Sequence, residues 1–167
     1  MQGLEIADIH RLNAALGWLG LDAPADARAE LEAIAPAQQW HPAVLETRWL
    51  LCAHEQNWRE GLAVAEQELQ CAPEDSSGWL HRAYALRRMN HGGLPQAWDA
   101  LLPASEKFPE EPVIAYNLAC YACQLNQLAD ARKWLQCAVK IGGQETIQKM
   151  ALADEDLKPL WPEIKNW

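Results

Sequence analysis

The sequence predicts an all-α protein: an α-α superhelix of four helix–turn–helix repeats with a C-terminal cap. Three observations predict this fold. The chain repeats itself with a period of 34 residues. Apolar residues recur three or four positions apart, as on one face of a helix, and nowhere alternate as in a strand. Short polar turns interrupt each repeat near its middle. A period of this size is typical of units that bury their apolar faces by stacking on neighbours.

The repeats stay in register along most of the chain. They occupy residues 8–41, 42–75, 76–111 and 112–145, with a two-residue insertion in the third. Position 20 of each repeat is small: Ala27, Gly61, Ala97 and Ala131. Position 24 reads Leu31, Ala65, Leu101 and Leu135, and position 8 reads Ala15, Trp49, Ala83 and Ala119. We expect helices to touch at these positions.

Each repeat is expected to hold two helices of roughly 13 residues joined by a turn. The turns are expected at 21–24, 56–57, 90–93 and 126–127, where Asn, Asp, Gly or Pro interrupts the apolar pattern. Between repeats, Pro73 and Pro109 end a helix, Asp75 and Ser76 suit a helix cap, and Pro112 suits a first helical position. One more helix is expected at 146–153. It belongs to a C-terminal cap, 146–167, and we expect the repeats and this cap to form a single domain, 1–167.

The charge of the chain is uneven. Its formal net charge is −9, and residues 1–75 hold thirteen acidic and four basic side chains, against ten of each in residues 76–167. Without a basic stripe, nucleic acid is not an expected partner. The acidic half suits either a solvated surface or a basic partner. No window reaches the ~18 apolar residues of a membrane span, and the acidic start differs from a signal peptide, so we expect a cytoplasmic protein.

One string resembles a chemical motif, the C-x-x-C pair Cys120 and Cys123. Both cysteines are expected inside a helix, away from the helix N-terminus that would lower a thiol pKa. No second cysteine or histidine pair completes a zinc site, and the five histidines show no catalytic spacing. We therefore expect free thiols, no metal, no cofactor and no enzymatic activity.

The period and its signature residues resemble the tetratricopeptide repeat family. The third repeat matches at Trp79, Ala83, Leu86, Ala97, Leu101 and Pro109, and the fourth at Leu118, Ala119, Ala131, Leu135 and Ala138. The stretches 116–125 and 151–161 also resemble the ends of small bacterial members of the family. The second repeat departs from the pattern, with Trp49 and Glu68 at two positions that are usually small, so its packing must differ locally.

The resemblance implies a protein–protein interaction module that binds a peptide along its concave face. The family's ligand-facing positions 2, 5, 9, 12 and 13, with position 6, imply these groove residues: Leu50, His54, Leu80, Tyr84, Arg87, Arg88, Tyr116, Asn117, Cys120 and Gln124. The same positions hold Ile9, Leu12, Leu16, Leu19 and Gly20 in the first repeat, Ala43, Glu46 and Ala53 in the second, Ser77 in the third, and Val113 and Cys123 in the fourth.

The implied partner is a protein or peptide with apolar side chains and a carboxylate, which Arg87 and Arg88 would bind. Alternatively, both arginines pair with acidic groups of the chain itself, such as Glu46 or Glu55. Two further functions are compatible with the sequence: a small dedicated chaperone for a secreted or assembling partner, and a structural homo-oligomer, such as a homodimer, that covers the groove with a second copy. A thiol or metal enzyme using Cys120 and Cys123 ranks last.

Overall fold

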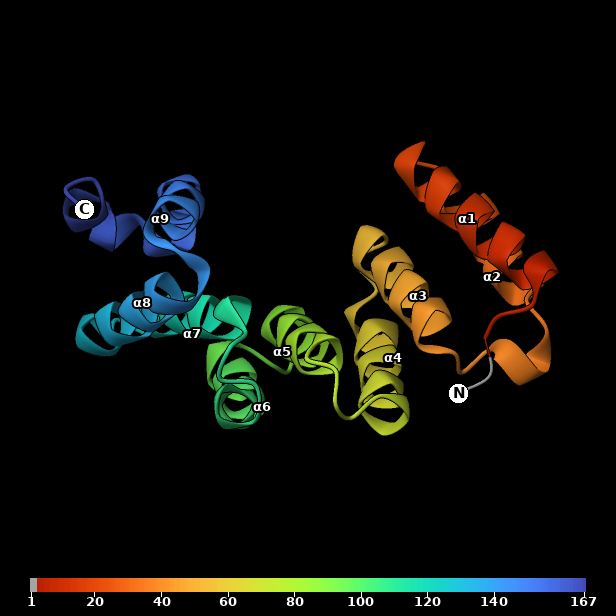
Figure 1. Ribbon diagram of the computed structural model, residues 1–167, viewed down its shortest axis with the longest axis horizontal. Helices are drawn as coiled ribbons and strands as arrows, with labels where there is room; N and C mark the ends of the chain where they lie inside the picture. The colour runs from red at the N-terminus through yellow and green to blue at the C-terminus, as the bar shows by residue number, and fades with distance from the viewer. Residues whose placement is uncertain (1–2) are drawn as a thin grey trace. The chain divides into compact units, whose positions relative to one another are not determined.

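The computed structural model describes residues 3–167, and this part of the chain is all-α (Figure 1). It contains ten α-helices, two short 3-10 helices and no strand among the described residues. The predicted fold class is therefore confirmed. The helices pack into two compact units, one ending at Met89 and the other covering Asn90–Trp167.

Unit 1 holds the first five α-helices and one 3-10 helix. They are α1 (Ile6–Gly20), α2 (Pro24–Glu32), η1 (Pro36–Gln38), α3 (Pro42–His54), α4 (Trp58–Cys71) and α5 (Ser77–Arg88). Neighbouring helices pack in chain order, and α3 also contacts both α1 and α5. Helix α2 is shorter than the roughly 13 residues expected for it. It ends at Glu32, and the chain continues as the short helix η1, which begins at Pro36.

Unit 2 holds the remaining elements. They are α6 (Leu94–Lys107), α7 (Pro112–Gln124), α8 (Leu128–Gly142), α9 (Gln144–Ala153), η2 (Glu155–Leu160) and α10 (Trp161–Ile164). Helix α7 packs against α6, α8 and η2. The predicted third repeat, 76–111, is thus divided between the units, with α5 packed in unit 1 and α6 in unit 2.

Three of the turns inside the repeats share one backbone conformation. Asp22, Gln56 and Asn126 each occupy position 15 of a repeat, and each has a φ close to +60°. The amide that follows each of them donates to the carbonyl five residues earlier, as Asn57 N does to Cys52 O at 2.8 Å. This is the left-handed helix end that asparagine and aspartate tolerate best among residues other than glycine, and Gln56 adopts it as well. The third repeat uses Gly93 instead, with φ at 123°, beyond its two-residue insertion.

The repeat register also predicts the core. Every residue at positions 8, 20 and 24 of the four repeats is buried. Most are alanine or glycine, and a small side chain lets two helices approach closely. Three are leucines, and Trp49, the largest of the set, is buried as well.

Side chains at the repeat boundaries set where several helices begin. Asn57 accepts from Glu60 N at the start of α4, and Glu111 accepts from Val113 N at the start of α7, where Pro112 takes the first helical position. At the start of α5 the acceptor is Asp75, whose carboxylate receives the amide of Ser77 at 2.8 Å. Ser76 itself makes no side-chain cap. Within residues 3–167, no helix combines the length and the apolarity that crossing a membrane requires.

Candidate functional site

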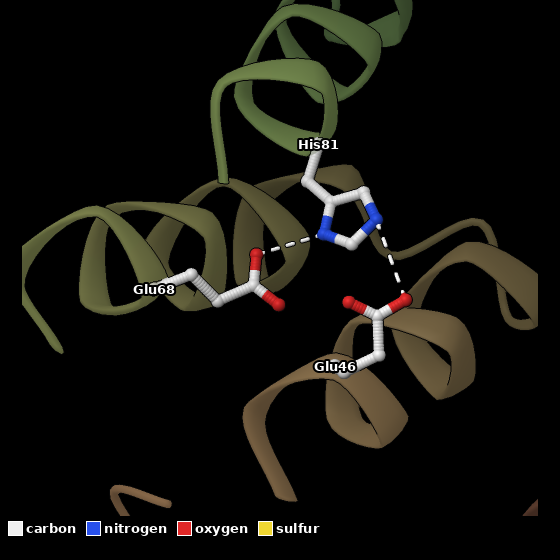
Figure 2. Close-up of side chains that lie close together, drawn as sticks. All are labelled: Glu46, Glu68 and His81. Atoms are coloured by element: carbon white, nitrogen blue, oxygen red, sulfur yellow. Dashed lines mark hydrogen bonds and ion pairs between the residues drawn. The ribbon is translucent and has the colours of Figure 1, made fainter. Parts of the chain in front are cut away.

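Three helices of unit 1 bring two carboxylates to one imidazole. Glu46 lies on α3, Glu68 on α4 and His81 on α5 (Figure 2). His81 Nδ1 lies 2.7 Å from Glu68 Oε2, and His81 Nε2 lies 3.8 Å from Glu46 Oε1. The contact with Glu68 is a hydrogen bond, whereas the one with Glu46 is too long for one.

The ring of His81 is held in place by its neighbours. The indole of Trp49 stacks on it, with ring centroids 3.8 Å apart and planes 7° apart. Helices α4 and α5 also approach each other closely at Gly78, where a Cβ atom would lie only 3.0 Å from the amide nitrogen of Leu69. The missing side chain of Gly78 lets α5 come close enough to α4 for His81 to reach Glu68.

The cluster carries more negative than positive charge. Glu68 is only 5% exposed, and its Oε1 has no hydrogen-bond partner among the described residues. Figure 2 shows this oxygen pointing toward the carboxylate of Glu46. Burial raises the pKa of Glu46, and the charges of Glu68 and Asp75 raise it further, against the lowering effect of His81. A carboxylate with a raised pKa in a hollow of the surface is a common mark of a functional site.

The cluster borders a pocket of about 210 Å³. Glu46, Glu68 and Asp75 contribute carboxylates to its lining, which contains no lysine or arginine among the described residues. Pro42, Ala43, Ala72 and Gly78 provide small or apolar walls, and Ser77 completes the lining. We call this hollow the acidic pocket. Pockets that hold whole small molecules are typically about 300–1,000 Å³, so this one has the size for a single side chain.

Two groups of residues in the described chain have the atom types of metal ligands. In each of them, Glu46–Glu68–His81 and Cys120–Asp154–Asp156, the ligand atoms lie within 4.8 Å of one another. In the first group the direct hydrogen bond from His81 to Glu68 occupies one ring nitrogen. The second group mixes a thiol with carboxylates, which favour different metals.

The predicted groove residues of unit 1 lie on α3 and α5. Leu50 and His54 are exposed, and His54 forms an ion pair with Asp22 at 3.1 Å. Leu80, Tyr84, Arg87 and Arg88 are half-buried. The guanidinium of Arg88 lies 3.4 Å above the ring of Tyr84 and 5.5 Å from that of Trp58. Three further residues at ligand-facing positions, Ala43, Glu46 and Ser77, line the acidic pocket together.

The predicted groove residues of unit 2 lie on α7, under the chain's own C-terminal segment. Tyr116 and Cys120 are buried, and both donate to the carboxylate of Asp154, at 3.0 and 3.5 Å. Gln124 donates to the carbonyl of Asp156 at 2.9 Å, and Asn117 donates to the carbonyl of Val113 within α7. For α7 to offer an open groove, the segment 154–160 would have to move away.

The C-x-x-C pair lies in a setting that disfavours thiolate chemistry. Cys120 and Cys123 are both buried within α7. Burial raises the pKa of Cys123, and the carboxylates of Asp156 and Asp154 add to the effect. A reactive thiol needs the opposite shift.

The sequence places Glu46 at a ligand-facing position but does not connect it with Glu68 or His81. A signal is nevertheless present, because Trp49 and Glu68 are the two residues at which the second repeat departs from its pattern. Both contact His81. The departures therefore mark one site, built where three helices meet.

The comparisons with known proteins support the fold. No protein-family model matches the chain, and no curated protein matches it. Two solved structures of MamA are similar, one of residues 41 to the end from Desulfovibrio magneticus RS-1 and one of the RS-1 ArsTM double mutant. Each has a TM-score of 0.68 and 15% sequence identity, covering 98% of this chain and 96% of the other. At this identity the likeness shows a shared helical-repeat fold and nothing further.

Proposed function

We propose that this chain is a non-catalytic protein–protein interaction module that binds a peptide segment on unit 1. The proposed surface, which we call the inner face, consists of eight of the residues at ligand-facing positions of α1, α3 and α5. Its members are Ile9, Leu16, Ala43, Glu46, Leu50, Ser77, Leu80 and Tyr84.

The observation that carries the proposal is an exposed apolar set on two contacting helices. Ile9 and Leu16 on α1 are 41% and 42% exposed, and Leu50 on α3 is 38% exposed. Ile9 and Leu16 are seven residues apart and share a helix face. Single exposed apolar residues are ordinary, but several on one face typically mark a surface that a partner covers.

The rest of the inner face adds polar features that suit recognition of a peptide. Tyr84 presents an aromatic ring between Trp49 and Arg88, and the acidic pocket opens between α3 and α5. Aromatic and arginine side chains at the centre of an apolar surface are enriched among residues that dominate binding. Stacked helical repeats of this kind commonly bind partners along such a surface.

Selection from a random peptide display library on the intact protein tests the proposal without a known partner. Enriched peptides should bind the wild-type chain, and the Leu16→Gln/Leu50→Gln variant should bind them about tenfold more weakly or worse, because two apolar contacts are lost. Both substitutions replace exposed side chains, so the fold should persist. Leu21→Gln is the matched control, since Leu21 is exposed in the turn after α1, outside the inner face.

Equal binding of the enriched peptides to wild type and to the double variant would contradict the proposal. A second outcome would also contradict it. If the wild-type protein sediments as a dimer that the Leu16→Gln/Leu50→Gln substitutions dissociate, the exposed set serves a second copy of the chain.

A further inference from the structure

We propose that the acidic pocket holds the cationic side chain of an arginine or lysine in a bound partner segment. This inference rests on the proposed function and names the chemistry that the inner face would recognise. The acidic pocket lies between the first turns of α3 and α5, with the end of α4 beside it.

The acidic pocket has an excess of acidic side chains. Three carboxylates line it, and among the described residues the structure pairs them with the imidazole of His81 and with no lysine or arginine. The imidazole serves Glu68 at 2.7 Å and reaches Glu46 only at 3.8 Å. Glu46 and Glu68 therefore face each other with at most one positive charge between them. A second cation would relieve the repulsion that this arrangement stores.

One buried oxygen identifies where that cation would be needed. Glu68 Oε1 is buried and accepts no hydrogen bond from the described residues, whereas Oε2 of the same carboxylate is bonded to His81. A buried carboxylate oxygen without a donor costs free energy, and a donor from a ligand would recover it. In Figure 2 this oxygen points toward Glu46. An N–H group that entered between Glu46 and Glu68 would therefore face it.

The shape of the acidic pocket favours a side chain over a bare ion. Its volume is about 210 Å³, far more than one ion fills, and its walls at Pro42, Ala43 and Ala72 suit the methylene stem of a lysine or arginine. The side chains of both residues carry an apolar stem and a cationic end. The net charge of unit 1 also favours a cationic ligand. Unit 1 holds thirteen acidic and seven basic side chains, so its electrostatic field attracts basic segments.

The test compares two peptides that differ in one charge. Acetyl-Leu-Ala-Arg-Ala-Leu-amide and its citrulline analogue have nearly the same shape, but only the first is cationic. Each is titrated into the intact ¹⁵N-labelled protein at low salt and followed by ¹H–¹⁵N NMR. We expect the arginine peptide to bind about tenfold more tightly, since a charge-assisted hydrogen bond is about twice as strong as a neutral one. Amide shifts should centre on Ala43, Glu46, Ala72 and Gly78.

The variant Glu46→Gln/Asp75→Asn removes two charges while keeping the shape of the acidic pocket. Asparagine retains the acceptor that caps Ser77 N, and the side chain of Glu46 is 44% exposed, so the fold should persist. This variant should lose most of the preference for the arginine peptide, although it keeps the carboxylate of Glu68. The matched control is Glu66→Gln, which removes an exposed charge from α4 outside the acidic pocket and should keep the preference for arginine.

Three results would overturn the inference. One is equal affinity of the wild-type protein for the arginine and citrulline peptides. Another is a preference for arginine that is undiminished in Glu46→Gln/Asp75→Asn. The third is stoichiometric binding of Zn²⁺ to the wild-type protein that Glu46→Gln abolishes, which would make the cluster a metal site. If both peptides bind equally and shift the amide signals of Leu16 and Leu50, the proposed function stands without the acidic pocket. If neither peptide shifts amide signals of the inner face, the proposed function loses support as well.

Discussion

The imidazole of His81 lies flat against the indole of Trp49, with ring centroids 3.8 Å apart and planes 7° apart. The ring of Tyr84 lies at 76° to the plane of the same indole, with ring centroids 5.6 Å apart. Trp49 thus joins α3 to α5 at a repeat position that holds alanine in the other three repeats. The stack orients His81 toward Glu68 and Glu46, so it connects the packing of unit 1 with the electrostatics of the acidic pocket.

Trp49→Ala should destabilise the protein by about 3–5 kcal/mol, the usual cost of truncating a buried aromatic residue. The repeat pattern alone would predict a tolerated change, because alanine is the usual residue at this position. The structure predicts the loss because the helices are spaced around the indole. Urea denaturation measures it, and Trp40→Ala, which truncates an exposed tryptophan, is the control. Equal midpoints for the two variants would mean that the indole does not space the helices.

Glu46→Gln should raise the stability of the protein at pH 7. Burial raises the pKa of Glu46, with Glu68 on α4 and Asp75 before α5 adding to the shift and His81 opposing it. An acid with a raised pKa binds its proton more tightly in the folded state, so folding is most favoured below the ordinary glutamate pKa of about 4.3 and loses stability as pH rises through the shifted value. Glutamine has no charge to bury.

Thermal denaturation at pH 7 and pH 4 measures this effect. The gain in melting temperature from Glu46→Gln should be larger at pH 7 than at pH 4, and Glu66→Gln should show no such difference. A variant that is less stable than wild type at pH 7 would show that the contact with His81 outweighs the desolvation of Glu46. The same substitution is expected to impair binding, so a more stable protein that binds arginine less well would separate function from folding.

Ala97→Leu and Ala131→Leu should each destabilise the protein by about 1–3 kcal/mol, because overpacking a close helix contact forces the backbone to shift. Both residues are fully buried at position 20 of their repeats. Chemical denaturation measures the change. Ala129→Leu is the control, since Ala129 is exposed on the same helix as Ala131. If the two buried variants unfolded at the wild-type midpoint, the repeat register would be misplaced.

The five cysteines, none of which forms a disulfide in the described chain, should differ in reactivity. Cys137 is exposed, whereas Cys52, Cys120 and Cys123 are buried, and burial raises the pKa of Cys52 to about 12. Iodoacetamide at pH 8 should therefore modify Cys137 first, because the thiolate is the reactive form and must be accessible. Mass spectrometry of the digested protein measures the order. Modification of Cys123 as fast as Cys137 would revive a redox role for the C-x-x-C pair.

Arg87→Glu should weaken the binding of a selected peptide that carries a carboxylate by ~2 kcal/mol or more, since the lost charge-assisted contact becomes a repulsion. Arg88 packs on Tyr84 and Trp58, so its substitution would also remove these ring contacts. Titration calorimetry with the acid and amide forms of one peptide measures the effect. Equal losses for the two forms would show that Arg87 does not read a carboxylate.

The repeat architecture is predictable from the sequence because its signals are local. Apolar spacing, the small residue at position 20 and the polar turns act within one repeat, and the left-handed residues Asp22, Gln56 and Asn126 fall where turns are expected. The division of the third repeat between two units is not predictable in this way. It depends on how closely α5 packs on α4 at Gly78, which periodicity does not encode.

The candidate site is only partly predictable, for a related reason. The expectation of no metal and no catalytic group comes from spacing along the chain, whereas Glu46, Glu68 and His81 come from three different helices. On α7, the helical register places Tyr116 and Cys120 on a ligand-facing surface. It does not reveal that Asp154, far along the chain, accepts hydrogen bonds from both. Burial also raises the pKa of Tyr116, so its hydroxyl remains a donor to Asp154.

A ¹H–¹⁵N NMR titration of the intact protein with a peptide enriched by selection would locate the binding surface residue by residue. We expect the largest amide shifts on the inner face, at Leu16, Glu46, Leu50 and Tyr84, and we expect Leu16→Gln/Leu50→Gln to suppress them. Amide shifts confined to α4, or to unit 2, would show that the inner face is not the surface that binds peptides.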